Sequence, residues 1–176
     1  VREEGAVVAT ARRSRAEAWS TSVSPRIDGI LIELETLVDR AANGVVALEH
    51  RKGNGTGFVL TDESFVLTNA HVVRNTRTVL VRFFDGGTEE ARVVGSDPAT
   101  DLALLRVGPR PGAALPLAPN GSVKVGQVVI AVGHPFGFER SVSLGVVSAL
   151  ERRLPNRDGS VLDGLIQTDA AINPGN

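Results

Sequence analysis

From Gly44 onward, the chain consists of short apolar runs separated by residues that favour turns. Six runs before residue 108 have the composition and length of strands: residues 45–49, 57–60, 65–68, 78–84, 91–95 and 102–107. Glycine, asparagine, aspartate and proline are concentrated between them, as expected for tight connections. Since no amphipathic helix separates the runs, the pattern argues against parallel βαβ winding. It predicts an antiparallel barrel over residues 45–107, which closes its own edges.

The remainder of the chain predicts an incomplete second unit. Residues 108–120 are rich in proline and glycine, which predicts a linker between two barrels. Residues 121–176 contain three further apolar runs, at 127–133, 141–150 and 165–169, with a polar, charged loop expected at 151–164. Three strands can form part of a barrel but cannot close one. We therefore predict an all-β fold with a complete first barrel and a partial second barrel over residues 121–176.

The N-terminal part of the chain differs in composition from this strand-rich part. Residues 1–24 mix Arg, Glu, Ala and Ser without a period, which predicts a flexible extension. Ser24 and Pro25 then have the residue types of an N-cap and a first helical position. Apolar residues follow at helical spacing: Ile30, Leu34, Leu37, Val38 and Ala41. Within residues 25–44 we expect an amphipathic helix of about three to four turns.

Composition excludes several classes of function. The formal net charge of -1 provides no long-range attraction for nucleic acid. The chain has no cysteine, so it has no disulfide and no thiol nucleophile. His50, His71 and His134 do not have the spacing of metal ligands, and neither a metal nor another cofactor is expected. No apolar run reaches the length of about 18 residues that would span a membrane.

His71 is the first candidate for catalysis. It follows an apolar run and precedes Val72, at the point where a strand is expected to end. An imidazole with a pKa near 6.5 can accept and return a proton near neutral pH, which suits a general base. Taken alone, the same position also suits a structural histidine that bonds to backbone groups.

Asp101 is the second candidate. It stands directly before the apolar run that begins at Leu102, where a carboxylate can accept a hydrogen bond from an imidazole Nδ1–H. The alternative is an aspartate that caps the turn at residues 98–100. Asp85 and Asp97 lie in turn sequences of their own and compete for the catalytic role.

Gly175 is the third candidate, within the turn sequence at residues 173–176. Glycine lets a backbone N–H point at a developing oxyanion in conformations that a Cβ would strain. The order of histidine, aspartate and glycine turn matches the chain order of a chymotrypsin-type triad. A glycine-rich stretch at residues 53–57 lacks the lysine and the helix of a phosphate-binding loop, so it predicts a β-turn or bulge.

Several longer motifs resemble the HtrA/Deg proteases, a family of trypsin-like serine endopeptidases. The matching segments run in the family's order from Val45 to the end of the chain: GTGFVL at 55–60, LTNAHVV at 67–73, DPATDLA at 97–103, GHPFG at 133–137, SLGVVSAL at 143–150 and IQTDAAINPGN at 166–176. Together these motifs are highly specific.

The resemblance implies a chymotrypsin-like double β-barrel with the active site between the barrels. His71 would be the general base, Asp101 the carboxylate that orients it, and the amide of Gly175 one oxyanion donor. The polar loop at 151–164 would correspond to the family's sensor loop. The resemblance further implies an exported protein of protein quality control that acts on unfolded or misfolded polypeptides, with possible homotrimers.

The family motif around the nucleophile runs Gly-Asn-Ser-Gly-Gly, and this chain ends with Gly175 and Asn176. We therefore expect Ser-Gly-Gly to follow, and expect the 176-residue chain alone to be inactive. Two alternatives stay open at this point. A natural chain that ended here would be a non-catalytic polypeptide-binding or regulatory remnant, and a cysteine at the next position would make a chymotrypsin-like cysteine protease.

Overall fold

The structure is a computed structural model of the chain, and it describes residues 25–50, 53–62, 64–133, 141–155 and 161–172. Within these residues, one helix precedes nine strands. Their bounds are α1 Pro25–Gly44, β1 Val45–His50, β2 Gly53–Thr61, β3 Phe65–Asn69, β4 Thr78–Arg82, β5 Thr88–Asp97, β6 Leu102–Arg106, β7 Val128–Gly133, β8 Ser141–Pro155 and β9 Val161–Thr168. The predicted all-β fold with a single N-terminal helix is confirmed.

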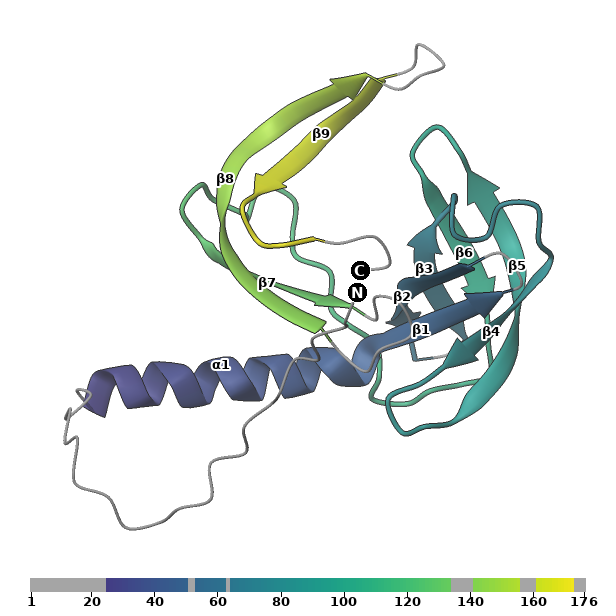
Figure 1. The fold of residues 1–176 in the computed structure, drawn as a ribbon, viewed down its shortest axis with the longest axis horizontal. Coiled ribbons are helices and arrows are strands. Elements are labelled where there is room, and N and C mark those ends of the chain that lie inside the picture. The colour runs from purple at the N-terminus through teal and green to yellow at the C-terminus, as the bar shows by residue number, and fades with distance from the viewer. Residues whose placement is uncertain (1–24, 51–52, 63, 134–140, 156–160, 173–176) are drawn as a thin grey trace, which may run out of the picture.

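Six strands close into an antiparallel barrel in the order β1-β2-β3-β6-β5-β4, at the right of Figure 1. Alternate side chains point inward because successive residues of a strand face opposite sides. In β4, for example, Val79 and Val81 are buried while their neighbours are exposed. The interior is filled by valine and leucine side chains, among them Val46, Leu48, Val59, Val66 and Leu105. This core holds the barrel's loops at fixed positions.

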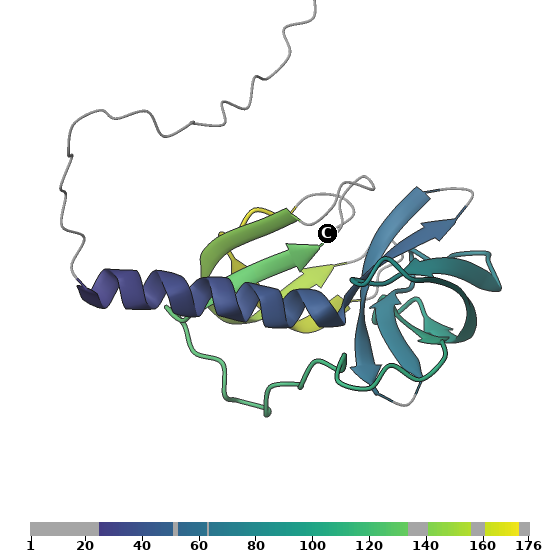
Figure 2. The same ribbon diagram turned by 90° about the horizontal axis from the view of Figure 1, so that it is seen from below.

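The other strands form an open antiparallel sheet in the order β7-β8-β9, which curves beside the barrel in Figure 1. Helix α1 runs along this sheet and leads directly into β1, as the view from below in Figure 2 shows. Its side chains Leu34, Leu37 and Ala41 line a small cavity with residues of β7. At 20 residues, α1 is longer than the three to four turns expected from its apolar spacing.

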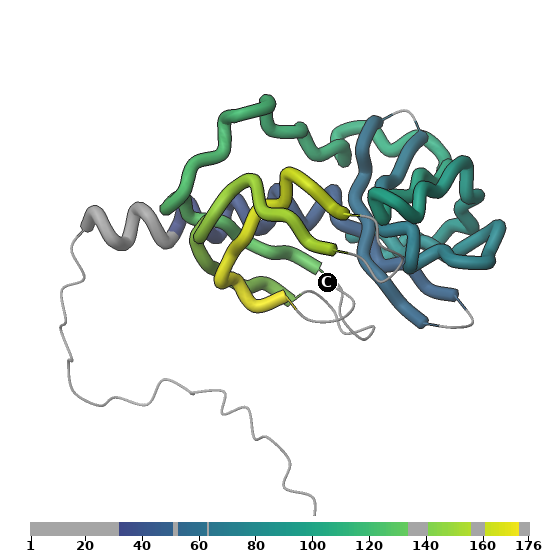
Figure 3. The backbone as a smooth tube through the Cα atoms, turned by 90° about the horizontal axis from the view of Figure 1, so that it is seen from above, coloured from purple at the N-terminus to yellow at the C-terminus, as the bar shows by residue number. Residues whose placement is uncertain are grey.

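The proline- and glycine-rich segment passes along one side of the molecule from the barrel to the open sheet, as Figure 3 shows from above. Its first part is bonded to the barrel: Ala114 N–H donates to Asp62 Oδ1 at 2.9 Å, and Leu115 N–H donates to the Val59 carbonyl at 3.0 Å. The connection is therefore fixed to the barrel surface up to Leu115.

Two sequence-based boundaries were wrong. The polar loop expected at residues 151–164 is largely strand, because β8 continues to Pro155 and β9 begins at Val161. Backbone pairing needs no apolar side chains, and an Arg153–Asp163 ion pair of 2.9 Å spans the two strands. The glycine-rich stretch at 53–57 was expected to be a turn or bulge, but it pairs with β1 along its whole length.

Candidate active site

His71 lies on a tight turn that follows β3. Val72 N–H donates to the Asn69 carbonyl at 3.2 Å, and Val73 N–H donates to the Ala70 carbonyl at 3.2 Å. Ala70, Val72 and Val73 are buried, whereas the imidazole is 69% exposed. Gly55 makes room for this turn, since a Cβ there would lie 2.6 Å from a methyl carbon of Val72. The buried residues beside His71 anchor the turn to the barrel, and the ring of His71 lies at the surface.

Asp97 holds the turn that precedes Asp101. Its carboxylate accepts hydrogen bonds from Ala99 N–H at 2.9 Å and from the Thr100 hydroxyl at 2.8 Å. The Thr100 hydroxyl, followed by the Ala99 N–H, lowers the pKa of Asp97 from its ordinary value of 3.8. Asp97 thus fills the turn-capping role that the sequence left open for Asp101.

Asp101 faces the end of β3. Its backbone adopts φ of 55°, a left-handed conformation that is uncommon outside glycine but that aspartate tolerates. Its carbonyl accepts from Ala70 N–H at 3.0 Å and from the Asn69 side-chain amide at 3.1 Å. Its Oδ1 accepts from the backbone N–H of His71 at 2.9 Å. These bonds join the β5–β6 turn to the histidine turn.

The second carboxylate oxygen meets the imidazole. His71 Nδ1 lies 2.8 Å from Asp101 Oδ2, the length of a charge-assisted hydrogen bond. Asn69 also donates its side-chain N–H to Oδ2, at 3.3 Å. With the proton on Nδ1 directed at the carboxylate, Nε2 keeps a free lone pair and can accept a proton. This geometry suits a general base with an orienting carboxylate.

On the open sheet, β8 holds the segment that leads from β9 toward residues 173–176. Val146 N–H donates to Asp169 Oδ1 at 2.7 Å, and the Ser143 hydroxyl donates to the Ala171 carbonyl at 2.6 Å. Gly145 has no Cβ, so the backbone of Ala170 can pass directly over it. Gly175 itself lies outside the described residues. Sequence reasoning gave no role to Ser143, Gly145 or Asp169, because their partners lie more than 20 residues away.

Neither a metal site nor a membrane span is found in the described part of the chain. Within it, no three histidine, cysteine, aspartate or glutamate residues are grouped so that they could hold a metal ion. No helix in those residues has the length and apolar composition to cross a bilayer. Asp85, which competed with Asp101 for the catalytic role in the sequence, accepts a hydrogen bond from Gly87 N–H of its own turn at 2.8 Å and lies 3.5 Å from Arg110.

Comparison with known proteins finds one matching family and several similar proteins. The trypsin-like peptidase domain family matches residues 55–176. A protein of Pseudomonas putida strain F1, named as a probable periplasmic serine endoprotease DegP-like, is 45% identical over 122 residues, which is 69% of this chain and 25% of that protein. A protein of the same name from Halomonas elongata is 44% identical over 128 residues, covering 73% and 26%.

Two solved structures are similar in fold to this chain. The HtrA-type protease AlgW, determined with a tripeptide, has a TM-score of 0.73 and 38% identity over 81% of this chain and 48% of its own. A serine endoprotease from Yersinia pestis has a TM-score of 0.68 and 33% identity over 80% and 50%. This chain therefore spans about a quarter of the length of the relatives and about half of the solved chains.

Proposed function

The chain belongs to the trypsin-like peptidase family, and on that basis we propose that it forms the catalytic region of an HtrA/Deg-type serine endopeptidase. Its substrates would be unfolded or misfolded polypeptides. The observation that carries the proposal is the contact of His71 Nδ1 with Asp101 Oδ2 at 2.8 Å, on two turns that are bonded to each other. A remnant that only binds polypeptide has no need of this geometry, and the relatives are named as serine endoproteases.

The proposed reaction uses a serine that follows Asn176. Nε2 of His71 takes the proton from the serine hydroxyl, and the serine oxygen attacks the scissile carbonyl carbon. Asp101 stabilises the imidazolium that forms. The oxyanion is stabilised by the N–H of Gly175 and by that of the serine itself. His71 then returns the proton to the leaving amine, and a water molecule hydrolyses the acyl-enzyme by the same sequence of steps.

We also propose that the protein acts in the periplasm, since the relatives carry that word in their names. A homotrimer is the assembly that the resemblance suggests, with α1 as a contributing surface. Exposed apolar side chains on α1 support this: Ile32 is 62% exposed and Leu37 is 53% exposed. Light scattering should give a trimer mass for the wild type, and a lower mass for a Leu37→Glu variant. A monomeric wild type would refute the assembly.

The catalytic proposal is tested by covalent labelling of the serine-containing protein with a fluorophosphonate. In a peptide-cleavage assay, Asp101→Asn should lower kcat about 10⁴-fold, because an asparagine in this position favours the wrong imidazole tautomer. His71→Ala should nearly abolish labelling. The matched control is Asp85→Asn, which removes a carboxylate that bonds to its own turn and to Arg110. Strong labelling of the His71→Ala protein would show that the base has been misassigned.

A further inference from the structure

A polar groove of about 350 Å³ opens beside the candidate catalytic histidine. His71 lines it, together with residues from the β1–β2 end of the barrel and from the turn after β3. His50, Asn54, Arg74 and Asn75 contribute polar groups to these walls. None of these four residues has a role in the proposed triad.

The backbone at Arg74 belongs to a hydrogen-bonded turn beside this groove. It follows Val73, which is 2% exposed, and Thr76 N–H donates to the Val73 carbonyl at 3.1 Å. The Thr76 hydroxyl also donates to the Thr78 carbonyl at 2.7 Å. Asn75 has φ of 61°, which turns the chain sharply after Arg74. The side chain of Arg74 is exposed, but its backbone belongs to a bonded turn.

The guanidinium of Arg74 has no ion-pair partner within the described ranges. Arg82, in contrast, contacts Glu49 at 3.0 Å, and Arg110 lies between Asp85 and Glu89. Glu49 and Glu90 line a second groove that Arg74 also borders, but neither lines the groove that reaches His71. The groove beside the histidine therefore presents the positive charge of Arg74, with no carboxylate along its described walls.

We propose that this groove binds an acidic side chain, aspartate or glutamate, of the polypeptide substrate, and that Arg74 selects it. The inference rests on the proposed protease function. In a serine protease the histidine gives its proton to the leaving amine, which belongs to the C-terminal side of the scissile bond. We assign the groove that His71 lines to substrate residues on that side. A planar guanidinium is well suited to bind a carboxylate there, with His50 and Asn54 as further polar contacts.

The test compares peptide pairs that differ by aspartate or asparagine at each of the first positions C-terminal to the cleaved bond. With the serine-containing protein, kcat/KM should favour aspartate by about 2- to 5-fold at one of these positions, as expected for an exposed ion pair. The preference should shrink at high salt. Arg74→Gln should lower kcat/KM for the aspartate peptides to the value for the matching asparagine peptides, and Arg74→Glu should reverse the preference.

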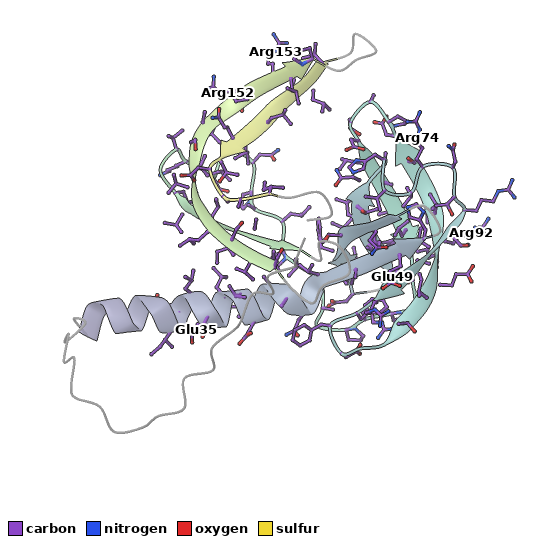
Figure 4. All side chains as sticks on the ribbon, in the orientation of Figure 1. Glu35, Glu49, Arg74, Arg92, Arg152 and Arg153 are labelled. Atoms are coloured by element: carbon purple, nitrogen blue, oxygen red, sulfur yellow. The ribbon has the colours of Figure 1, made fainter. Side chains whose placement is uncertain are left out.

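Arg92→Gln provides the matched control. Arg92 is also an exposed arginine on the barrel, and Figure 4 labels both residues, but it lines neither of the two grooves that Arg74 borders. This variant should keep the full preference. An aspartate preference that survives in Arg74→Gln would overturn the proposal, as would one found only on the N-terminal side of the bond, or none at all.

Fluorophosphonate labelling separates this inference from the proposed function. Arg74→Gln should label at the wild-type rate, because the reagent does not extend along the groove. A protein that labels and cleaves but shows no aspartate preference refutes the role of Arg74 alone. A wild-type protein that neither labels nor cleaves refutes the protease function and this inference together.

Discussion

Replacing Gly145 with alanine tests how β8 positions the segment that leads to the proposed oxyanion loop. A Cβ on residue 145 would lie 2.6 Å from Asp169 Oδ1 and 2.7 Å from Ala170 Cα, and its contact with Ala170 N would be closer still. Carbon contacts are ordinarily about 3.5–4.0 Å, so the segment must move by about 1 Å. Because two of these atoms belong to the backbone of Ala170, a change of side-chain rotamer cannot relieve the contact.

The expected cost has two parts. Overpacking of this kind typically costs about 1–3 kcal/mol. Movement of Asp169 also breaks its 2.7 Å hydrogen bond with Val146 N–H, and a bond to a charged group contributes about 1.5–3 kcal/mol. Gly145→Ala should therefore lower the free energy of unfolding by about 2.5–6 kcal/mol. It should also slow fluorophosphonate labelling, since the displaced segment leads toward Gly175.

Urea denaturation and labelling rates measure these two effects on the serine-containing protein. Gly95→Ala is the matched control, because a Cβ on this strand residue would meet nothing within 4 Å and neither glycine has a positive φ. Its stability should change by less than about 1 kcal/mol. If Gly145→Ala unfolds and labels like the wild type, then the close approach of Ala170 to β8 does not position the segment.

Three further results are expected. Leu48→Ala, in the fully buried barrel core, should cost about 2–5 kcal/mol of unfolding free energy in urea, and a loss under about 1 kcal/mol would place Leu48 outside the core. The Thr100 hydroxyl lowers the pKa of Asp97, so the ionised carboxylate stabilises the fold above the ordinary value of 3.8, and this stabilisation is lost as the pH falls through the lower folded value. The difference in unfolding free energy between wild type and Asp97→Ala should therefore become smaller in acid. A difference that becomes larger would contradict this. Ser143→Ala removes the hydrogen bond to the Ala171 carbonyl and should cost about 0.5–1.5 kcal/mol with slower labelling, whereas unchanged labelling would show that this bond does not position the segment.

The strands of the barrel could be predicted because their pattern is local. In β4, alternation of buried and exposed residues around Val79 and Val81 directly reflects the two faces of a strand. The hairpin of β8 and β9 could not be predicted in full, since its outer part is paired through backbone groups and the Arg153–Asp163 ion pair. Charged residues in that arrangement have the composition of a loop.

The sequence by itself determined that this chain forms a closed β-barrel followed by further strands, and that His71 and Asp101 are candidates for a catalytic pair. Those conclusions depend on apolar spacing, turn residues and motif order, all of which are properties of the linear sequence. Only the tertiary structure decided that Asp97 caps its own turn while Asp101 faces the imidazole, and that Gly145 supports the segment after β9. The physical reason is that hydrogen bonds and close backbone contacts between distant residues exist only after the strands have paired.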